Sequence, residues 1–289
     1  MLSSVKMKRN RLLYLLLVLM SIPYAANAKQ HKESRIIKVM SYNIRLGSGK
    51  DGNNSWEFRR PATIEMIKDQ APDIFGVQEA LSYQLDYINA NCRKYASVGF
   101  GREDGRSAGE HMSIYWNRKS IKMLKWGTFW LSETPEVPSK GWDARYKRTA
   151  TWALMQDRKS GKRFYFVNTH LDHRGKEAQK NGLKLIVDRI DTINPEGYPM
   201  ILTGDFNINP DNPALAHLDS VMESTRNVAL KTDTHNTFNG WSDVPNGRII
   251  DYIYFKRFNK CLEYQTVNKQ YLDIPFVSDH YPITALLVF

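Results

Sequence analysis

The chain has 289 residues, of which 42% are hydrophobic and 12% aromatic, and its formal net charge is +11. This apolar content is ample for one large domain, and the absence of low-complexity segments and internal repeats excludes a solenoid. The two cysteines are Cys92 and Cys261. A fold of this size does not depend on disulfides, so these thiols either pair in an oxidising compartment or stay buried and unpaired.

The first 28 residues are expected to form a signal peptide. Four basic residues precede an apolar stretch from Leu12 to Ile22, and Ala26-Asn27-Ala28 offers the small residues of a cleavage site. Cleavage there would leave a mature chain that begins at Lys29, so we expect an exported protein, periplasmic or extracellular. An uncleaved anchor is the alternative, although the stretch is short for a membrane-spanning helix. No cysteine lies near this point, which argues against a lipoprotein.

Without the four basic residues of this leader, the net charge of +11 becomes +7. A moderately basic chain favours polyanionic substrates, nucleic acid or anionic lipid, and the charge serves solubility equally well. The longest basic cluster is Arg145-Tyr146-Lys147-Arg148, with Trp142 and Trp152 nearby. A solvated loop explains this cluster as well as a binding surface does.

Strand and helix patterns alternate along the first half of the mature chain, after a short N-terminal segment (residues 29–35). Asn43 closes the first strand, and helical spacing in the first helix puts Pro61 in its first turn, where proline is tolerated. The pattern predicts strands at Arg35–Tyr42, Ile74–Val77, Ser113–Trp116 and Lys122–Leu131, and helices at Arg59–Gln70 and Leu81–Cys92.

The second half follows a loop that contains proline and glycine (Ser132–Lys147), and it opens with the clearest hairpin signal of the chain. The polar turn Asp157–Lys162 separates the two strands of this hairpin. The pattern predicts strands at Thr149–Gln156, Arg163–Asn168, Met200–Thr203, Ile249–Phe255 and Pro282–Val288, and helices at Glu177–Asp191 and near Pro213–Leu218. From all these elements we expect one α/β domain at residues 36–289, with predominantly antiparallel sheets covered by helices.

Polar groups capable of chemistry stand at the ends of six of these strands. A core strand has no use for a carboxylate or an imidazole at its edge unless the group is paired or working. Any one of them alone suits a structural role, but six in one domain indicate a site. They are Asn43, Glu79, Asn168-Thr169-His170, Asp205 with Asn207, Asp251, and Asp279-His280.

The segment Gly204-Asp205-Phe206-Asn207 is the most informative of the six. It follows the apolar run Met200–Thr203, which reads as a buried strand. Asp205 and Asn207 are two residues apart, so an extended backbone would point both side chains to the same side. A carboxylate and a carboxamide that emerge together suit a site for a metal, a water or a phosphate oxygen.

These residue types suit metal-assisted hydrolysis of a phosphate ester. Glu79 and Asp279 are hard oxygen donors and Asn43 can add a neutral one, which favours Mg²⁺, Mn²⁺ or Ca²⁺ over zinc. Two imidazoles would divide the remaining work, one helping to activate water and the other binding a phosphoryl oxygen. Asp251 is suited to orient an imidazole and to fix its tautomer.

Six ordered motifs carry a resemblance to a known family. They are Ser41-Tyr42-Asn43, Gln78-Glu79, Asn168-Thr169-His170-Leu171, Gly204-Asp205-Phe206-Asn207, Ile250-Asp251-Tyr252 and Ser278-Asp279-His280. This order resembles the endonuclease/exonuclease/phosphatase superfamily, which includes pancreatic-type deoxyribonuclease, apurinic endonucleases, deadenylases, inositol polyphosphate 5-phosphatases and neutral sphingomyelinases. The resemblance implies a four-layer α/β/β/α sandwich, in which two mixed sheets pack face to face with helices outside.

By motif match, the resemblance implies that Glu79 is the main metal ligand, with Asn43 and Asp279 near the ion. Arg45 is a departure, because apurinic endonucleases carry an acid that helps to bind metal at that position. The departure argues against their lesion-specific activity and would place a cation over the phosphate instead.

The resemblance also implies roles for the remaining motif residues. Asp205 and Asn207 would position the attacking water and the scissile phosphate. His280, oriented by Asp251, would be the base or the phosphate-binding imidazole. His170 would contact the phosphate oxygens or assist the leaving group.

Two further stretches, Trp130–Pro135 and Gly141-Trp142-Asp143, resemble a subgroup of secreted bacterial members. Arg148 precedes a predicted strand, as a substrate-contacting arginine often does in this family. Arg148, Trp142 and Arg45 are therefore candidate substrate contacts. Core packing is the alternative to a stacking role for the tryptophans Trp130, Trp142 and Trp241.

The leading hypothesis is a secreted, divalent-metal-dependent phosphodiesterase or phosphomonoesterase, monomeric and without an obligate protein partner. Its substrate would be a phosphorylated small molecule, nucleic acid or a phospholipid headgroup. A sphingomyelinase would be expected to carry an apolar hairpin insertion, and a nuclease would carry denser basic and stacking residues. An inositol-phosphate phosphatase stays open. A catalytically silent phosphate- or polyanion-binding module and a two-carboxylate glycosidase are alternatives of other classes.

Overall fold

The computed structural model describes residues 35–242 and 247–289. The predicted signal peptide lies outside the described residues. Within these ranges, the strands form two six-stranded sheets, and pairs of helices cover them. None of the helices in this part of the chain is long and apolar enough to cross a membrane.

The first sheet has the strand order β11-β12-β1-β2-β4-β3. β1 pairs in parallel with β2, and every other pair in this sheet is antiparallel. Alternate residues of β1 belong to two different cores, Val39 to one and Met40 to the other, because the sheet is covered on both faces. The strands are β1 (Ile36–Asn43), β2 (Ile74–Gln78), β3 (Tyr95–Val98), β4 (Ile114–Asn117), β11 (Lys260–Thr266) and β12 (Ile283–Val288).

The second sheet has the strand order β5-β6-β7-β8-β10-β9. Only β7 and β8 are parallel in it, and the 18-residue helix α3 connects them. Residues of β7 alternate in the same way between two cores, with Phe166 facing the first sheet and Val167 facing helices. The strands are β5 (Ile121–Trp130), β6 (Thr149–Asp157), β7 (Arg163–His170), β8 (Met200–Asp205), β9 (Glu223–Ser224) and β10 (Asp251–Lys256).

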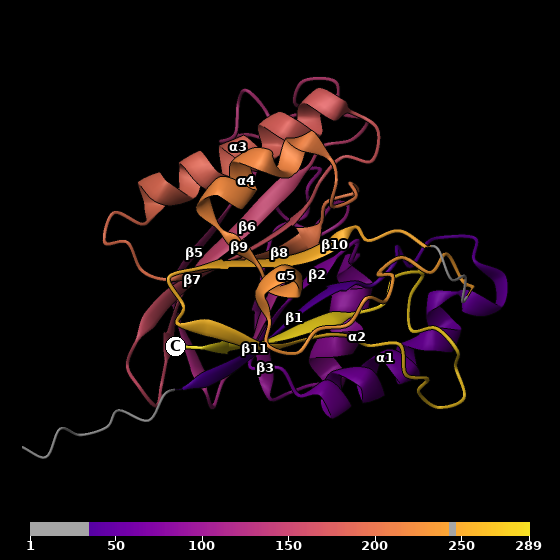
Figure 1. Cartoon of the computed structure of the whole chain (residues 1–289). Coiled ribbons are helices and arrows are strands. Elements are labelled where there is room, and N and C mark those ends of the chain that lie inside the picture. Colours follow the sequence, from indigo (N-terminus) through magenta and orange to yellow (C-terminus); the bar gives the residue numbers. More distant parts are fainter. Residues whose placement is uncertain (1–34, 243–246) are drawn as a thin grey trace, which may run out of the picture. The chain divides into compact units, whose positions relative to one another are not determined.

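The elements build a four-layer sandwich, which confirms the predicted fold class (Figure 1). Apolar residues of both sheets form one core between them, and α1 and α2 close the outer face of the first sheet. The outer face of the second sheet packs on α3 and α4. The helices are α1 (Trp56–Gln70), α2 (Ser82–Asn91), α3 (Lys176–Ile193), α4 (Ala216–Val221) and α5 (Thr225–Val228), with 3₁₀ turns at Gly52–Asn54 and Pro213–Leu215.

The first helix starts earlier than predicted. α1 begins at Trp56, which places Pro61 in the second turn and not in the first. Trp56 is buried and its ring lies edge-on to Tyr87, with 5.9 Å between ring centres. This packing extends the helix upstream, although proline lacks the N–H that a helix interior normally uses.

The two edge strands of the first sheet differ from the prediction. The edge strands β3 and β11 were not predicted, and β11 contains an irregularity between Cys261 and Glu263 that breaks its alternation. Cys92 and Cys261 are free and buried in different cores. The thiols therefore follow the unpaired alternative.

Candidate active site

Polar residues at strand ends of both sheets line one cleft of about 560 Å³. In the first sheet, β1 ends at Asn43, and the parallel strand β2 ends at Gln78, directly before Glu79. In the second sheet, the parallel strands β7 and β8 end at His170 and Asp205. A hydrogen bond of 2.9 Å from Asn43 Nδ2 to Asp205 Oδ2 joins the sheets at this edge. The site is therefore divided between the two sheets.

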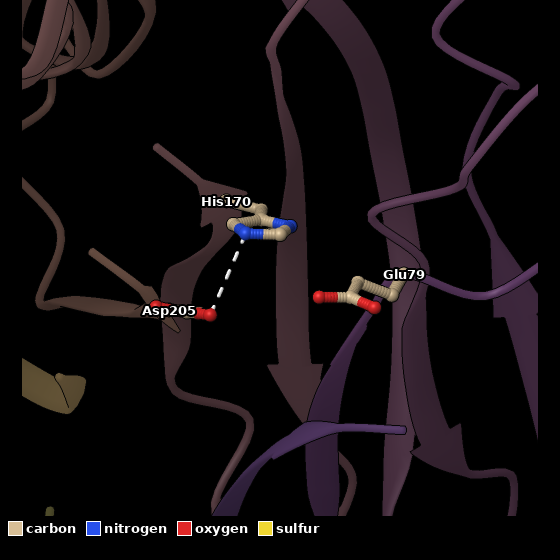
Figure 2. A group of neighbouring side chains, drawn as sticks. All are labelled: Glu79, His170 and Asp205. Carbon is tan, nitrogen blue, oxygen red and sulfur yellow. Dashed lines mark ion pairs between the residues drawn. The ribbon is translucent and has the colours of Figure 1, made fainter. Parts of the chain in front are cut away.

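Glu79, His170 and Asp205 lie around one point of the cleft (Figure 2), and one ligand atom of each lies within 4.8 Å of the others. Glu79 has a φ of 63°, which is uncommon for a residue with a side chain. The backbone N–H of Leu46 donates to Glu79 Oε2 at 2.8 Å and holds the carboxylate in place. The hard oxygens of the two carboxylates fit Mg²⁺ or Mn²⁺.

The amide of Asn43 is turned away from the orientation that a metal ligand needs. The backbone N–H of Arg45 donates to Asn43 Oδ1 at 3.0 Å, which fixes the amide. Nδ2 therefore faces the carboxylates and donates to Glu79 at 3.0 Å as well as to Asp205. Asn43 thus holds two carboxylates together. Asp279 lines the same cleft and lies 3.6 Å from the Arg45 guanidinium.

His280 lies between two carboxylates. Its Nδ1 is 2.9 Å from Asp251 Oδ2, and its Nε2 is 3.7 Å from Asp205 Oδ2. Burial disfavours the charged imidazole, but Asp251 and Asp205 outweigh this effect and raise the pKa of His280 to about 10. Burial raises the pKa of Asp205 to about 7, against the attraction of His280. The cleft therefore holds a cationic imidazole beside a carboxylate that can accept a proton near neutral pH.

The Gly204–Asn207 segment forms a turn at the end of β8. The strand continues through Asp205, but Asn207 has a φ of 57° and is not extended. The Asn207 N–H donates to Asp205 Oδ1 at 2.8 Å, as in an Asx turn. The expectation that an extended backbone points both side chains to one side was wrong. Both side chains line the cleft because the backbone turns between them.

The side chain of Asn207 fixes the proton of His170. Its Nδ2 donates to the Leu171 carbonyl at 3.1 Å, which sets the amide orientation, and lies 2.9 Å from His170 Nε2. Nε2 therefore accepts a hydrogen bond, and neutral His170 carries its proton on Nδ1. Burial, together with the Arg148 and Arg102 guanidinium groups, holds the pKa of His170 well below its usual value.

Glu110 lines the cleft and was not predicted from the sequence. Its Oε2 lies 3.8 Å from His170 Nδ1 and 2.6 Å from Arg102 Nη1. Each imidazole of the site thus has a carboxylate beside its Nδ1, Asp251 for His280 and Glu110 for His170. Glu110 stands in the irregular segment between β3 and β4, so no strand pattern pointed to it.

One wall of the cleft is basic and aromatic, and we call Arg102, Tyr146, Arg148 and His173 the Tyr146 wall. The guanidinium carbons of Arg102 and Arg148 lie 5.2 and 5.9 Å from the centre of the Tyr146 ring. The His173 ring stacks on the same tyrosine at 5.8 Å. Arg148 is buried, and its Nη1 has no hydrogen-bond partner among the described residues. Of these four residues, only Arg148 was predicted as a substrate contact.

The other predicted substrate contacts differ in position. Arg45 lines the cleft and is held by Asp51 at 2.8 Å. Trp142 is not among the described residues that line the cleft, and its backbone N–H donates to the Glu133 carboxylate at 3.2 Å. Trp130 is buried and takes the packing role.

The model of the Endonuclease/Exonuclease/phosphatase family matches residues 40–280. The chain belongs to this family. A mannosyl-6-phosphatase of Bacteroides thetaiotaomicron VPI-5482 is 31% identical, with a TM-score of 0.84 over 88% of this chain and 100% of that one. An endonuclease/exonuclease/phosphatase of Bacteroides vulgatus is 32% identical, with a TM-score of 0.82 over 88% and 98%. An uncharacterized protein of Acanthamoeba polyphaga mimivirus is 24% identical over 271 residues, or 86% and 99% of the two chains.

The endonuclease/exonuclease/phosphatase family comprises hydrolases of phosphate esters that generally depend on a divalent metal. The chemistry of the cleft agrees with this membership. Hard carboxylate oxygens from both sheets converge in the group of Glu79, His170 and Asp205. Guanidinium groups flank them, as binding of an anionic phosphate requires.

Proposed function

We propose that the chain is a divalent-metal-dependent phosphoesterase whose ion is held by the carboxylates of Glu79 and Asp205, with the imidazole of His170 beside them. The observation that carries the proposal is the convergence of these three side chains from both sheets within 4.8 Å. The ion would neutralise charge on the phosphoryl group. The cationic His280 next to this group adds a hydrogen-bond donor for a phosphoryl oxygen.

The reaction is hydrolysis, in which a water oxygen bonds to phosphorus as the ester P–O bond breaks. The Asp205 carboxylate accepts a hydrogen bond from the attacking water and so positions it, and the departing oxygen takes up a proton. Asn207 contacts the Asp205 carboxylate and the His170 imidazole, so it fixes their positions. His280 keeps its proton at neutral pH, with a pKa raised to about 10 by Asp251 and Asp205 in spite of burial, and therefore binds phosphate instead of acting as the base.

The leaving group of the ester is proposed to rest on the Tyr146 wall. An exposed aromatic ring beside guanidinium groups suits a sugar ring or another polar cyclic group. Sugar phosphates are the first candidate substrates, because a relative that is 31% identical over the full length of its chain is a mannosyl-6-phosphatase. Nucleic acid and phospholipid headgroups are the alternatives to test beside them.

Product formation from a panel of esters, measured as inorganic phosphate for the monoesters and as the released monoester or nucleotide for the diesters, tests this function. The panel contains mannose 6-phosphate, glucose 6-phosphate, inositol phosphates, sphingomyelin, single-stranded DNA and RNA, each with and without Mn²⁺. Hydrolysis of a sugar phosphate that stops with EDTA and with Glu79→Ala is the expected result. Hydrolysis of a phosphate ester that survives EDTA would indicate a metal-free site. Absence of hydrolysis in every arm would favour a binding module.

We also propose that the protein is exported and belongs to a secreted subgroup of the family, with residues 1–28 as its signal peptide and 36–289 as the catalytic domain. The proposal rests on the basic segment, the apolar stretch and the Ala26-Asn27-Ala28 site. N-terminal sequencing of the protein from cell fractions tests it. A mature N-terminus at Lys29 outside the cytoplasm is expected, and a cytoplasmic chain that begins at Met1 would contradict it.

A further inference from the structure

A small group of polar side chains is buried between the two sheets, next to the apolar core. We call Ser41, Gln78, Asn168 and Thr203 the inter-sheet amide cluster. Each is at most 1% exposed. They come from β1 and β2 of the first sheet and from β7 and β8 of the second. Buried polar groups have to be hydrogen-bonded, so such a cluster constrains every strand that contributes to it.

The Asn168 amide makes the contacts between the sheets. Its Oδ1 accepts hydrogen bonds from Gln78 Nε2 at 2.6 Å and from Thr203 Oγ1 at 3.2 Å. Its Nδ2 donates to the backbone carbonyls of Val77 at 2.8 Å and Ser113 at 3.1 Å. One side chain of the second sheet is thus bonded to β2 and to the residue before β4 in the first.

The backbone of β2 is shaped for this contact. Gly76 stands where the amide enters, and a Cβ at this position would overlap Asn168 Oδ1. Glycine is therefore required here by close approach, and not by a left-handed backbone. Gln78 also donates to Ser41 Oγ at 3.2 Å, which extends the cluster to β1.

Two residues of the cluster are close in sequence to residues of the candidate active site. Gln78 directly precedes Glu79, and Asn168 is two residues before His170. Since the metal-binding group takes Glu79 from one sheet and the other two residues from the other, its geometry depends on the spacing of the sheets. The Asn43–Asp205 hydrogen bond of 2.9 Å spans the same gap.

We propose that the inter-sheet amide cluster is a positioning element that sets the spacing of the two sheets at the catalytic edge. It touches no reacting atom and acts through Glu79 and His170. The inference rests on the proposed function only for its metal-affinity readout. Its structural readout is the Asn43–Asp205 distance, which needs neither metal nor substrate.

The test uses two variants. Gln78→Met removes both hydrogen bonds of the Gln78 amide, to Asn168 and to Ser41, and keeps the length of the side chain. Asn168→Asp places an oxygen against two carbonyls. The matched control is Asp157→Asn. Asp157 accepts from Arg35 Nε at 3.0 Å and so joins the segment before β1 to β6, at the opposite end of these strands. Each variant is measured by thermal unfolding, by Mn²⁺ titration calorimetry and by crystallography.

We expect Gln78→Met to fold, to weaken Mn²⁺ binding about 10-fold or more, and to lengthen the Asn43–Asp205 contact beyond about 3.5 Å. The control should unfold at a lower temperature and keep wild-type Mn²⁺ affinity. An unchanged Asn43–Asp205 distance in Gln78→Met overturns the proposal, whatever the affinity. Equal weakening in the control overturns it as well. A wild type without hydrolysis refutes the proposed function alone, because the distance still decides this inference.

Discussion

The Nδ1 atom of His280 lies 2.9 Å from Oδ2 of Asp251, and both side chains are buried. Asp251 begins β10 of the second sheet, whereas His280 precedes β12 of the first, so this pair crosses between the sheets. The hydrogen bond assigns a proton to Nδ1 and leaves Nε2 facing Asp205. It therefore sets both the charge and the direction of the imidazole that we propose binds phosphate.

Asp251→Asn is expected to lower kcat about 10²- to 10⁴-fold, because the amide removes the charge that keeps His280 protonated. Steady-state hydrolysis of the preferred ester measures the effect. The control is Asp188→Asn on the exposed side of α3, where Asp188 pairs with Lys184. A kcat of Asp251→Asn close to that of the control would show that the pair does not serve catalysis.

Tyr146→Ala is expected to raise KM about 2- to 10-fold with little change in kcat, because we propose that the ring contacts the leaving group and not the reacting atoms. Tyr146 is 44% exposed, and Tyr83, which is 45% exposed and outside the cleft lining, provides the matched control. Kinetics of both alanine variants on one sugar phosphate give the comparison. An unchanged KM in Tyr146→Ala would remove the wall from the substrate site.

Asp157→Asn is expected to destabilise the fold at pH 7 by about 1–3 kcal/mol. Burial opposes the charge of Asp157, but hydrogen bonds from Ser160 and Arg35 outweigh it and hold its pKa below the usual value. Because the folded pKa is depressed, this stabilisation is fully present above the unfolded pKa of about 3.9 and is lost progressively as the pH falls from there through the folded pKa. Urea unfolding from pH 7 to pH 3 should therefore narrow the difference in stability between wild type and variant, and a constant difference would refute this account.

Gly76→Ala is expected to destabilise the protein by about 1–3 kcal/mol, because the methyl group displaces the Asn168 amide between the sheets. Gly182→Ala in α3 is the control, since a Cβ there meets its nearest neighbour at 3.4 Å. Helix propensity makes the control neutral or stabilising by up to about 1 kcal/mol. Chemical denaturation measures the free energy of unfolding of both variants. Equal free energies would show that β2 can shift to accommodate the methyl group.

Most of the strands, and the polar residues at their ends, could be predicted from the sequence because both depend on local patterns. The polar turn of the hairpin marked β7 and a continuous apolar run marked β8, and His170 and Asp205 end these strands. The edge strand β11 escaped prediction because its irregularity after Cys261 interrupts the alternation. Trp56 started α1 early through a contact with Tyr87 on another helix, which no local pattern records.

The finer geometry of the site could not be predicted from the sequence, because it too depends on contacts that no local pattern records. Asn207 reaches the cleft through a left-handed turn, although its spacing from Asp205 fitted an extended strand equally well. The direction of the Asn43 amide depends on one backbone N–H, that of Arg45. Glu110 comes from an irregular segment, so only the folded chain brings it beside His170.

The central claim is tested most directly by titrating Mn²⁺ into metal-free protein while phosphate ester hydrolysis is followed. Wild type should be inactive without metal and gain activity with a saturating dependence on Mn²⁺. Glu79→Gln should need at least about 10-fold more Mn²⁺ for half-maximal activity. Glu177→Gln, a change of an exposed residue of α3, should match wild type. Full activity of the metal-free protein, or a Glu79→Gln variant that titrates like wild type, would contradict the account.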